Sequence, residues 1–96
     1  MINGNASEFI EELTYQDHYA YYQGKKYFFN GCQCQCDAEG NIVNVTLEVY
    51  NLTTNIAIFS TTQNSIAECI AAFEEAKIFD GKTFWEVEKD IEWVDC

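Results

Sequence analysis

The sequence contains no proline, no arginine and only one histidine. Without proline or a serine-rich stretch, nothing marks a linker between domains, so we expect a single α+β domain spanning residues 1–96. The first thirteen residues, MINGNASEFIEEL, lack the basic region and unbroken apolar run of a secretory signal, and no later segment is long enough to span a membrane. These absences predict a cytoplasmic protein that makes no membrane contact.

Positive charge is scarce, because five lysines face 16 acidic residues and the net charge is -11. A field of that sign repels nucleic acids and anionic membranes and attracts basic surfaces. The apolar fraction of 48% argues for a folded globule rather than a disordered acidic tail. We therefore expect no direct nucleic-acid binding and favour a basic protein as partner.

Catalytic motifs are also missing. The sequence has no glycine-rich phosphate loop, no serine in a nucleophile elbow and no cysteine beside a histidine. His18 stands alone, which is more typical of a strand-edge residue than of a base or a metal ligand. The sequence predicts a protein that is not an enzyme and that has no cofactor.

Alternation of apolar and polar residues predicts an antiparallel sheet. Residues 27–50 form the expected long hairpin, with a turn around Gly40, and residues 18–22 form a strand that turns at Gly24. A last strand is expected over residues 56–62, which are rich in β-branched and aromatic side chains. These strands make a β-meander of three or four strands.

Helical spacing predicts one helix before the sheet and two after it. Asn5 caps a short helix from Ala6 to about Leu13. Ser65 caps a central helix, and Thr83 caps a last helix that runs from Phe84 to about Trp93. The inward face of the central helix holds Ile66, Cys69, Ile70, Phe73 and Ala76, and the following Ile78 and Phe79 are expected to dock into the core. The fold class is α+β, with a short N-terminal helix and two C-terminal helices packed on the sheet.

Three of the five cysteines, Cys32, Cys34 and Cys36, alternate along the long hairpin and share one strand face. A bulge at Gly31 would turn that face inward, and we expect the three thiols to pack under the central helix. Metal binding or redox chemistry by these thiols is the alternative, with Cys69, Cys96 and His18 as further ligands, although three alternate positions on one strand converge poorly on one ion. No metal ligands are assigned.

The C-terminal third is the expected partner-binding surface. Carboxylates one helical turn apart lie about 5–6 Å from each other, comparable with phosphates along a nucleic-acid strand. Two explanations of the charge remain open, solubility of a small protein or occupation of a basic groove. The candidate contact residues are Glu74, Glu75, Asp80, Glu86, Glu88, Asp90, Glu92 and Asp95. A homodimer is also considered, because the tyrosine-rich edge at residues 19–22 could pair with a copy of itself.

The order of a short helix, a meander and the segment NSIAECIAAFEEAKIFDGKTFWEVEKDIEWVD resembles small acidic phage anti-CRISPR proteins. Within the central helix, the resemblance rests on Ser65, Ile66, Ala72 and Phe73. It implies a nucleic-acid mimic that blocks a basic groove of a CRISPR effector nuclease. The segments YYQGKKYFF and IFDGKTFWEVEKDIEWVD are also similar to uncharacterised small proteins of gut Firmicutes and their mobile elements, which implies no particular function.

Overall fold

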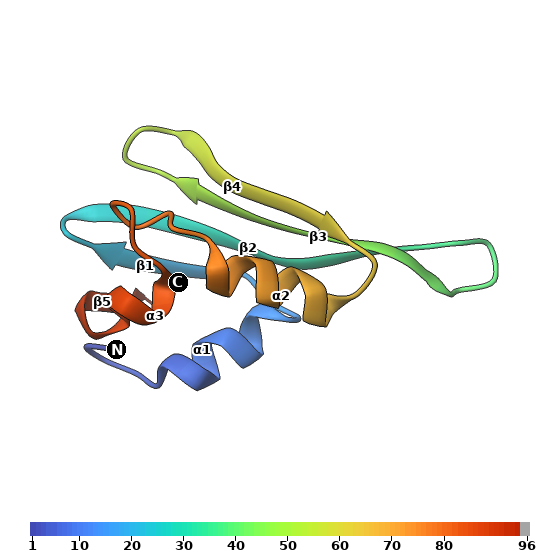
Figure 1. The fold of residues 1–96 in the computed structure, drawn as a ribbon, viewed down its shortest axis with the longest axis horizontal. Coiled ribbons are helices and arrows are strands. Elements are labelled where there is room, and N and C mark those ends of the chain that lie inside the picture. The colour runs from blue at the N-terminus through green and yellow to red at the C-terminus, as the bar shows by residue number, and fades with distance from the viewer. Residues whose placement is uncertain (95–96) are drawn as a thin grey trace.

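The chain folds into a five-stranded antiparallel sheet with its helices on one face (Figure 1). A computed structural model describes residues 1–94. The strands are β1 His18–Tyr22, β2 Lys25–Cys36, β3 Ile42–Asn51, β4 Ile56–Gln63 and β5 Ile91–Val94, in the order β4-β3-β2-β1-β5. The helices are α1 Ala6–Leu13, α2 Ile66–Glu75 and α3 Phe84–Val87, followed by a 3-10 turn, η1, Glu88–Asp90. The α+β class is confirmed, with one strand more than the expected maximum of four.

Local chemistry sets most element boundaries where the sequence predicts them. The side chain of Asn5 accepts the amides of Ser7 and Glu8 and starts α1, and Ser65 accepts the amide of Glu68 and starts α2. The β1–β2 turn needs positive φ, and Gln23 and Gly24 supply it with φ of 51° and 75°. Of the described helices, α2 is the longest at 10 residues, and none has the length and apolarity needed to cross a bilayer.

The core lies between the sheet and the helices and is dominated by phenylalanine. Phe9, Phe29, Phe73, Phe79 and Phe84 are fully buried. Most of their rings meet edge-on or tilted, as in the 6.0 Å contact between the Phe29 and Phe73 ring centres, whereas Phe9 and Phe84 are stacked with ring centres 5.5 Å apart. The predicted docking of Phe79 after the central helix is confirmed. Aromatic side chains from three helices, a strand and a connecting loop therefore hold the elements together.

The predicted bulge in β2 is present at Gly31. The register between β2 and β3 shifts between Asn30 and Gln33, so the inward face changes from Phe29 to Cys34, which lies opposite the buried Val45. The Gly31 amide donates to Asp17 Oδ1 at 2.8 Å. A Cβ on Gly31 would lie 2.4 Å from the backbone oxygen of Gln16, so only glycine lets the α1–β1 loop cross this strand.

The prediction that all three hairpin cysteines pack under the central helix is wrong. Cys32 is half-buried, but Cys34 and Cys36 are exposed. A strand of 12 residues spans about 40 Å, whereas a helix of 10 residues spans about 15 Å, so α2 cannot cover the whole hairpin. Figure 1 shows the end of the β2–β3 hairpin projecting past α2, and no described element lies against it.

The prediction of a last helix running to about Trp93 is also wrong. Helix α3 ends at Val87, and after η1 the chain becomes β5, which pairs with β1 through Tyr22 opposite Ile91 and Tyr19 opposite Val94. The predicted helix would have stacked like charges one turn apart, which is unfavourable. As a strand, the segment instead buries Ile91 and points Trp93 to the core side.

This strand closes the tyrosine-rich edge that the sequence left open. β1 lies between β2 and β5, so the expected pairing of two copies through residues 19–22 is blocked. The outer edge of β5 is itself covered by the N-terminal segment, because the Ile2 amide donates to the Ile91 carbonyl at 3.0 Å. The side chain of Asn3 continues that cover by bonding both the amide and the carbonyl of Trp93.

Candidate functional site

Seven of the eight acids predicted to bind a partner lie within residues 1–94, and two of them have structural roles. Glu86 belongs to a capping box: its carboxylate accepts the Thr83 amide at 3.0 Å, and that bond holds the pKa of Glu86 below its usual range. Glu88 pairs with the N-terminal ammonium of Met1 at 2.5 Å. Both carboxylates therefore stabilise the fold, and replacing them would disturb the structure as well as any interface.

Two more of the predicted acids have partners within the chain. Glu74 on α2 accepts the indole N–H of Trp85 at 2.7 Å, and Asp80 lies 3.4 Å from the Lys25 ammonium. These contacts connect α2 with α3 and the α2–α3 loop with the β1–β2 turn. Such exposed pairs contribute little to stability, about 0–1 kcal/mol each, but they orient the carboxylates toward their own chain.

Three of the remaining predicted acids are exposed. Glu75 is exposed at the end of α2, Asp90 is exposed in η1, and Glu92 is exposed on β5 opposite Tyr21 on the face of the sheet away from the helices. Asp95 lies outside the described residues. Within residues 1–94, a 3-10 turn and a strand follow Val87 in place of the expected acidic helix.

A denser group of carboxylates lies on α1, at the other end of the chain. Glu8 and Glu11 are exposed and Glu12 is half-buried, and the first 24 residues contain no lysine. Local desolvation, followed by the negative charge of these three carboxylates, raises the pKa of the Tyr15 hydroxyl, whose side chain is 68% exposed. We call Glu8, Glu11, Glu12 and Tyr15 the α1 acidic surface.

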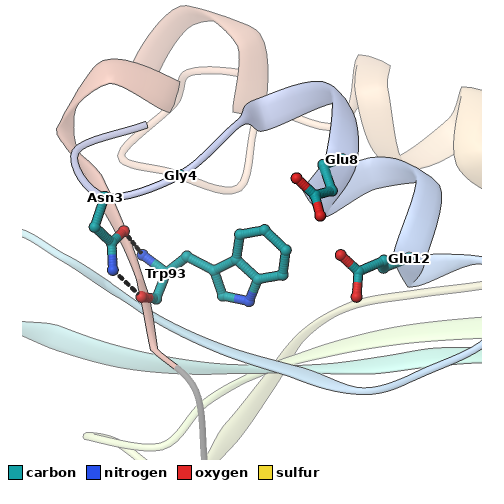
Figure 2. Close-up of a pocket in the computed structure, with 5 residues that line it drawn as sticks. All are labelled: Asn3, Gly4, Glu8, Glu12 and Trp93. Carbon is teal, nitrogen blue, oxygen red and sulfur yellow. Dashed lines mark hydrogen bonds between the residues drawn. The ribbon is translucent and has the colours of Figure 1, made fainter.

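A pocket opens beside this surface, under the first two turns of α1. It encloses about 460 Å³ and is lined by Asn3, Gly4, Glu8, Glu12 and Trp93. Figure 2 shows the indole of Trp93 beside the start of α1, with the side chains of Glu8 and Glu12 directed toward it from successive turns. The pocket thus combines an aromatic wall with two carboxylates.

Several contacts fix Trp93 in this position. Its amide donates to Asn3 Oδ1 at 2.7 Å, and its ring packs edge-on against Phe9 and against His18, with ring centres 5.3 Å and 4.9 Å apart. A Cβ on Gly4 would lie 2.9 Å from the indole, so glycine permits this close approach. A rigid indole beside carboxylates is suited to an organic cation such as an ammonium or a guanidinium.

His18 is a core residue rather than the strand-edge residue that the sequence predicts. It is 4% exposed and stacks on Phe9 with ring centres 4.5 Å apart. Because β5 pairs with β1, the strand that carries His18 is not at the sheet edge, and Trp93 of β5 lies beside it. Among residues 1–94, no group of three or more histidine, cysteine or acidic side chains has a geometry that could hold a metal ion. Cys96, one of the ligands considered, lies outside that range.

The cysteine chemistry is limited by burial. Desolvation raises the pKa of the Cys32 thiol to about 11, and burial also raises the pKa of Cys69, whose thiol donates to the Val45 carbonyl at 3.1 Å. Both groups are therefore thiols at neutral pH, which disfavours them as nucleophiles or metal ligands.

No sequence pattern singles out the α1 acidic surface or Trp93. The three glutamates of α1 resemble the solvated face of any short helix, and only their distance from every lysine sets them apart. Helical spacing places Trp93 in the expected last helix, and that placement does not predict its position beside Glu8 and Glu12. Comparison with known protein families, with curated proteins and with solved structures found no match to this chain.

Proposed function

We propose that this protein is a non-enzymatic binding protein that attaches to a basic surface of a protein partner through the α1 acidic surface and the adjoining Trp93 pocket. The observation that carries the proposal is the placement of Glu8 and Glu12 beside the half-buried indole of Trp93, with Glu11 on the same helix and no lysine in the first 24 residues. Carboxylates supply charge complementarity, and the aromatic ring supplies a surface on which a cation can rest.

Long-range attraction supports the same function. A net charge of -11 steers the chain toward basic partners and raises association rates, more strongly at low salt than at high salt. Glu8 lies three residues before Glu11 and four residues before Glu12, hence about 5–6 Å from each, so these carboxylates can occupy neighbouring phosphate positions of a groove that normally holds nucleic acid.

The partner class follows from this geometry and from the resemblance of the layout to small phage anti-CRISPR proteins. We propose a nucleic-acid-handling protein of the cytoplasm, such as a CRISPR effector nuclease, whose basic groove the acidic protein occupies in place of DNA. Inhibition then arises by exclusion, because the carboxylates and the phosphates compete for the same cations. The acidic residues bind the partner and catalyse no reaction.

The test compares two variants with the same change in charge. In the first, Glu8→Gln and Glu11→Gln remove two exposed carboxylates from α1, and in the control, Glu39→Gln and Glu75→Gln remove two exposed carboxylates elsewhere. Neither pair alters a hydrogen-bonded cap or the Met1–Glu88 ion pair. Thermal melts followed by circular dichroism check that both variants fold.

The assay measures DNA binding and cleavage by purified type II CRISPR effectors at increasing inhibitor concentration. We expect the α1 variant to inhibit about tenfold less potently, because it loses two ion pairs of about 0.7 kcal/mol each. The potency of the control variant should stay within twofold of that of the parent protein. Equal weakening of both variants would reduce the effect to net charge, and an α1 variant as potent as the parent would overturn the assignment to α1. A parent protein that inhibits no effector would overturn the partner class.

A further inference from the structure

A row of apolar side chains crosses the face of the sheet that no helix covers. Directly opposed positions run from Ala57 on β4 through Tyr50, Phe28 and Tyr19 to Val94 on β5, one from each strand. Figure 1 shows α1, α2 and α3 all on the opposite face. A solvated sheet face normally alternates to polar residues, so an apolar row of this extent is unusual for a surface facing only water.

The rings of this row touch one another and form a continuous strip. The Tyr19 and Phe28 ring centres are 5.0 Å apart, and those of Phe28 and Tyr50 are 6.3 Å apart. All three side chains are half-buried by their neighbours. Cross-strand aromatic contacts stabilise the sheet and also leave a rigid, flat surface that needs little further ordering to bind a partner.

One end of the strip already holds a cation. The Lys26 ammonium lies 5.0 Å from the ring centre of Tyr19 and 5.9 Å from that of Tyr21, the range of a cation–π contact. The opposite end, at Phe28 and Tyr50, has no such lysine among the described residues. The strip therefore contains a second, equivalent aromatic position without a cation from its own chain.

A carboxylate lies beside that second position. Glu48 is half-buried, accepts the Tyr50 hydroxyl at 3.2 Å and the Asn30 side-chain amide at 3.3 Å, and so is held next to the ring. The two ion pairs found within residues 1–94 involve Glu88 and Asp80 instead. Glu48 is thus a fixed negative charge that no lysine of the described chain neutralises.

From this arrangement we infer that the open sheet face is a second docking surface, which receives a protein segment presenting an arginine. The guanidinium stacks on Tyr50 and Phe28 and donates to the carboxylate of Glu48. Arginine suits the site better than lysine, because its planar fork can stack and bond at once. The inference goes beyond the proposed function and does not depend on the α1 acidic surface, which lies on the other side of the sheet.

Charge and composition select this occupant over the alternatives. A second copy of the chain brings no arginine within the 96 residues and adds its own net charge of -11, so it is repelled. Nucleic acid could stack on the rings, but its phosphates would meet Glu48 and Glu92 on the two sides of the strip. An arginine-bearing protein segment satisfies both the rings and the carboxylate.

The test uses a ten-residue peptide of alternating arginine and alanine, with lysine and citrulline versions as controls. Each is titrated into the uniformly ¹⁵N-labelled protein, and amide shifts locate the binding site. We expect shifts centred on Phe28, Glu48 and Tyr50, with the arginine peptide binding at least fivefold more tightly than the lysine peptide and the citrulline peptide weaker still.

Variants decide whether the named groups act. Glu48→Gln should lower the affinity for the arginine peptide at least fivefold. Glu39→Gln at the hairpin tip makes the same change in charge, and its affinity should stay within twofold of that of the parent protein. Tyr50→Phe keeps the ring and should retain the preference for arginine over lysine, while Tyr50→Thr should abolish that preference. Thermal melts verify the fold of each variant. If Tyr50→Thr unfolds, the comparison of Glu48→Gln with Glu39→Gln still tests the inference.

Three results would overturn this inference. The first is an arginine peptide that shifts only the α1 amides, which would leave the proposed function standing. The second is the absence of any shift on the sheet face at millimolar peptide. The third is a concentration-dependent dimer, detected by light scattering, whose contact shifts fall on Phe28 and Tyr50. Conversely, shifts on the sheet face together with an α1 variant that inhibits as strongly as the parent protein would support the docking face and refute the α1 assignment.

Discussion

The three cysteines of the hairpin should react with alkylating reagents at very different rates. Cys32 is half-buried with its pKa raised to about 11, whereas Cys34 and Cys36 are exposed beyond the end of α2. Neutral iodoacetamide is the suitable probe, because a charged reagent would respond to the acidic surface. The native and the guanidinium-unfolded protein are compared, so that each thiol provides its own reference.

The size of the effect on Cys32 follows from its thiolate fraction. At pH 8, a pKa of about 11 leaves about 0.1% thiolate, while the reference pKa of about 8.5 gives about 24% in the unfolded chain. This difference would slow alkylation about 240-fold. The more basic thiolate is intrinsically more nucleophilic, which raises the alkylation rate roughly tenfold for a Brønsted coefficient of about 0.4–0.5. Cys32 should therefore react about 20-fold more slowly in the native protein, before steric hindrance adds to the effect.

The pH dependence supplies a second check. Since the raised pKa keeps Cys32 protonated, its native alkylation rate should rise about a hundredfold between pH 8 and pH 10, against about fourfold for the unfolded chain. Digestion with chymotrypsin after Phe29 releases the hairpin, and tandem mass spectrometry assigns the label to individual cysteines. Cys69, which is fully buried, should be labelled only when the protein opens.

The pattern among the cysteines tests the geometry of the hairpin. Cys34 and Cys36 should react in the native protein within a few-fold of their unfolded rates. If both are instead protected as strongly as Cys69, the hairpin folds back and the packing under α2 expected from the sequence is right. If Cys32 reacts as fast as Cys34, the burial that raises its pKa is absent.

Two further predictions concern stability. Gly31→Ala should destabilise the fold by about 1–3 kcal/mol in urea titrations, because the new Cβ meets the Gln16 backbone, whereas Gly40→Ala at the open hairpin tip has no such clash and tests φ strain alone. The amides of Asn41 and Glu39 lower the pKa of Asp37. Its contribution to stability is therefore complete above the unfolded pKa of about 3.9 and is lost as the pH falls through the lower folded value. Urea titrations from pH 5 to pH 2 should show a smaller loss for Asp37→Asn, and an unchanged pH profile would contradict this role.

The parts of the fold that the sequence predicted well depend on neighbouring residues. Asn5, Ser65 and Thr83 cap helices where they were expected to, and the turn at Gly24 has the required positive φ. Each feature is a hydrogen bond or a backbone conformation completed within four residues. Such chemistry is visible in the sequence because its partners are adjacent in the chain.

The errors arose where distant segments decide the outcome. Residues 91–94 carry a periodicity that suits either a helix or a strand, and the open edge of β1 selects the strand. The exposure of Cys34 and Cys36 depends on how far α2 reaches along the sheet, which no pattern within the hairpin reports. The same tertiary choice removed the predicted acidic helix and brought Trp93 to α1.

The way in which the chain uses its carboxylates explains why so much negative charge survives folding. With five lysines and no arginine, the fold satisfies acids mainly through N–H donors: Glu86 accepts from Thr83, Asp17 from Gly31, and Glu74 from Trp85. A neutral donor stabilises a carboxylate without cancelling its charge. Charge used in this way still contributes to the external field. Structural roles and attraction to a basic partner are therefore compatible in the same residues, and only carboxylates without a structural role, such as Glu8 and Glu11, can separate the two by substitution.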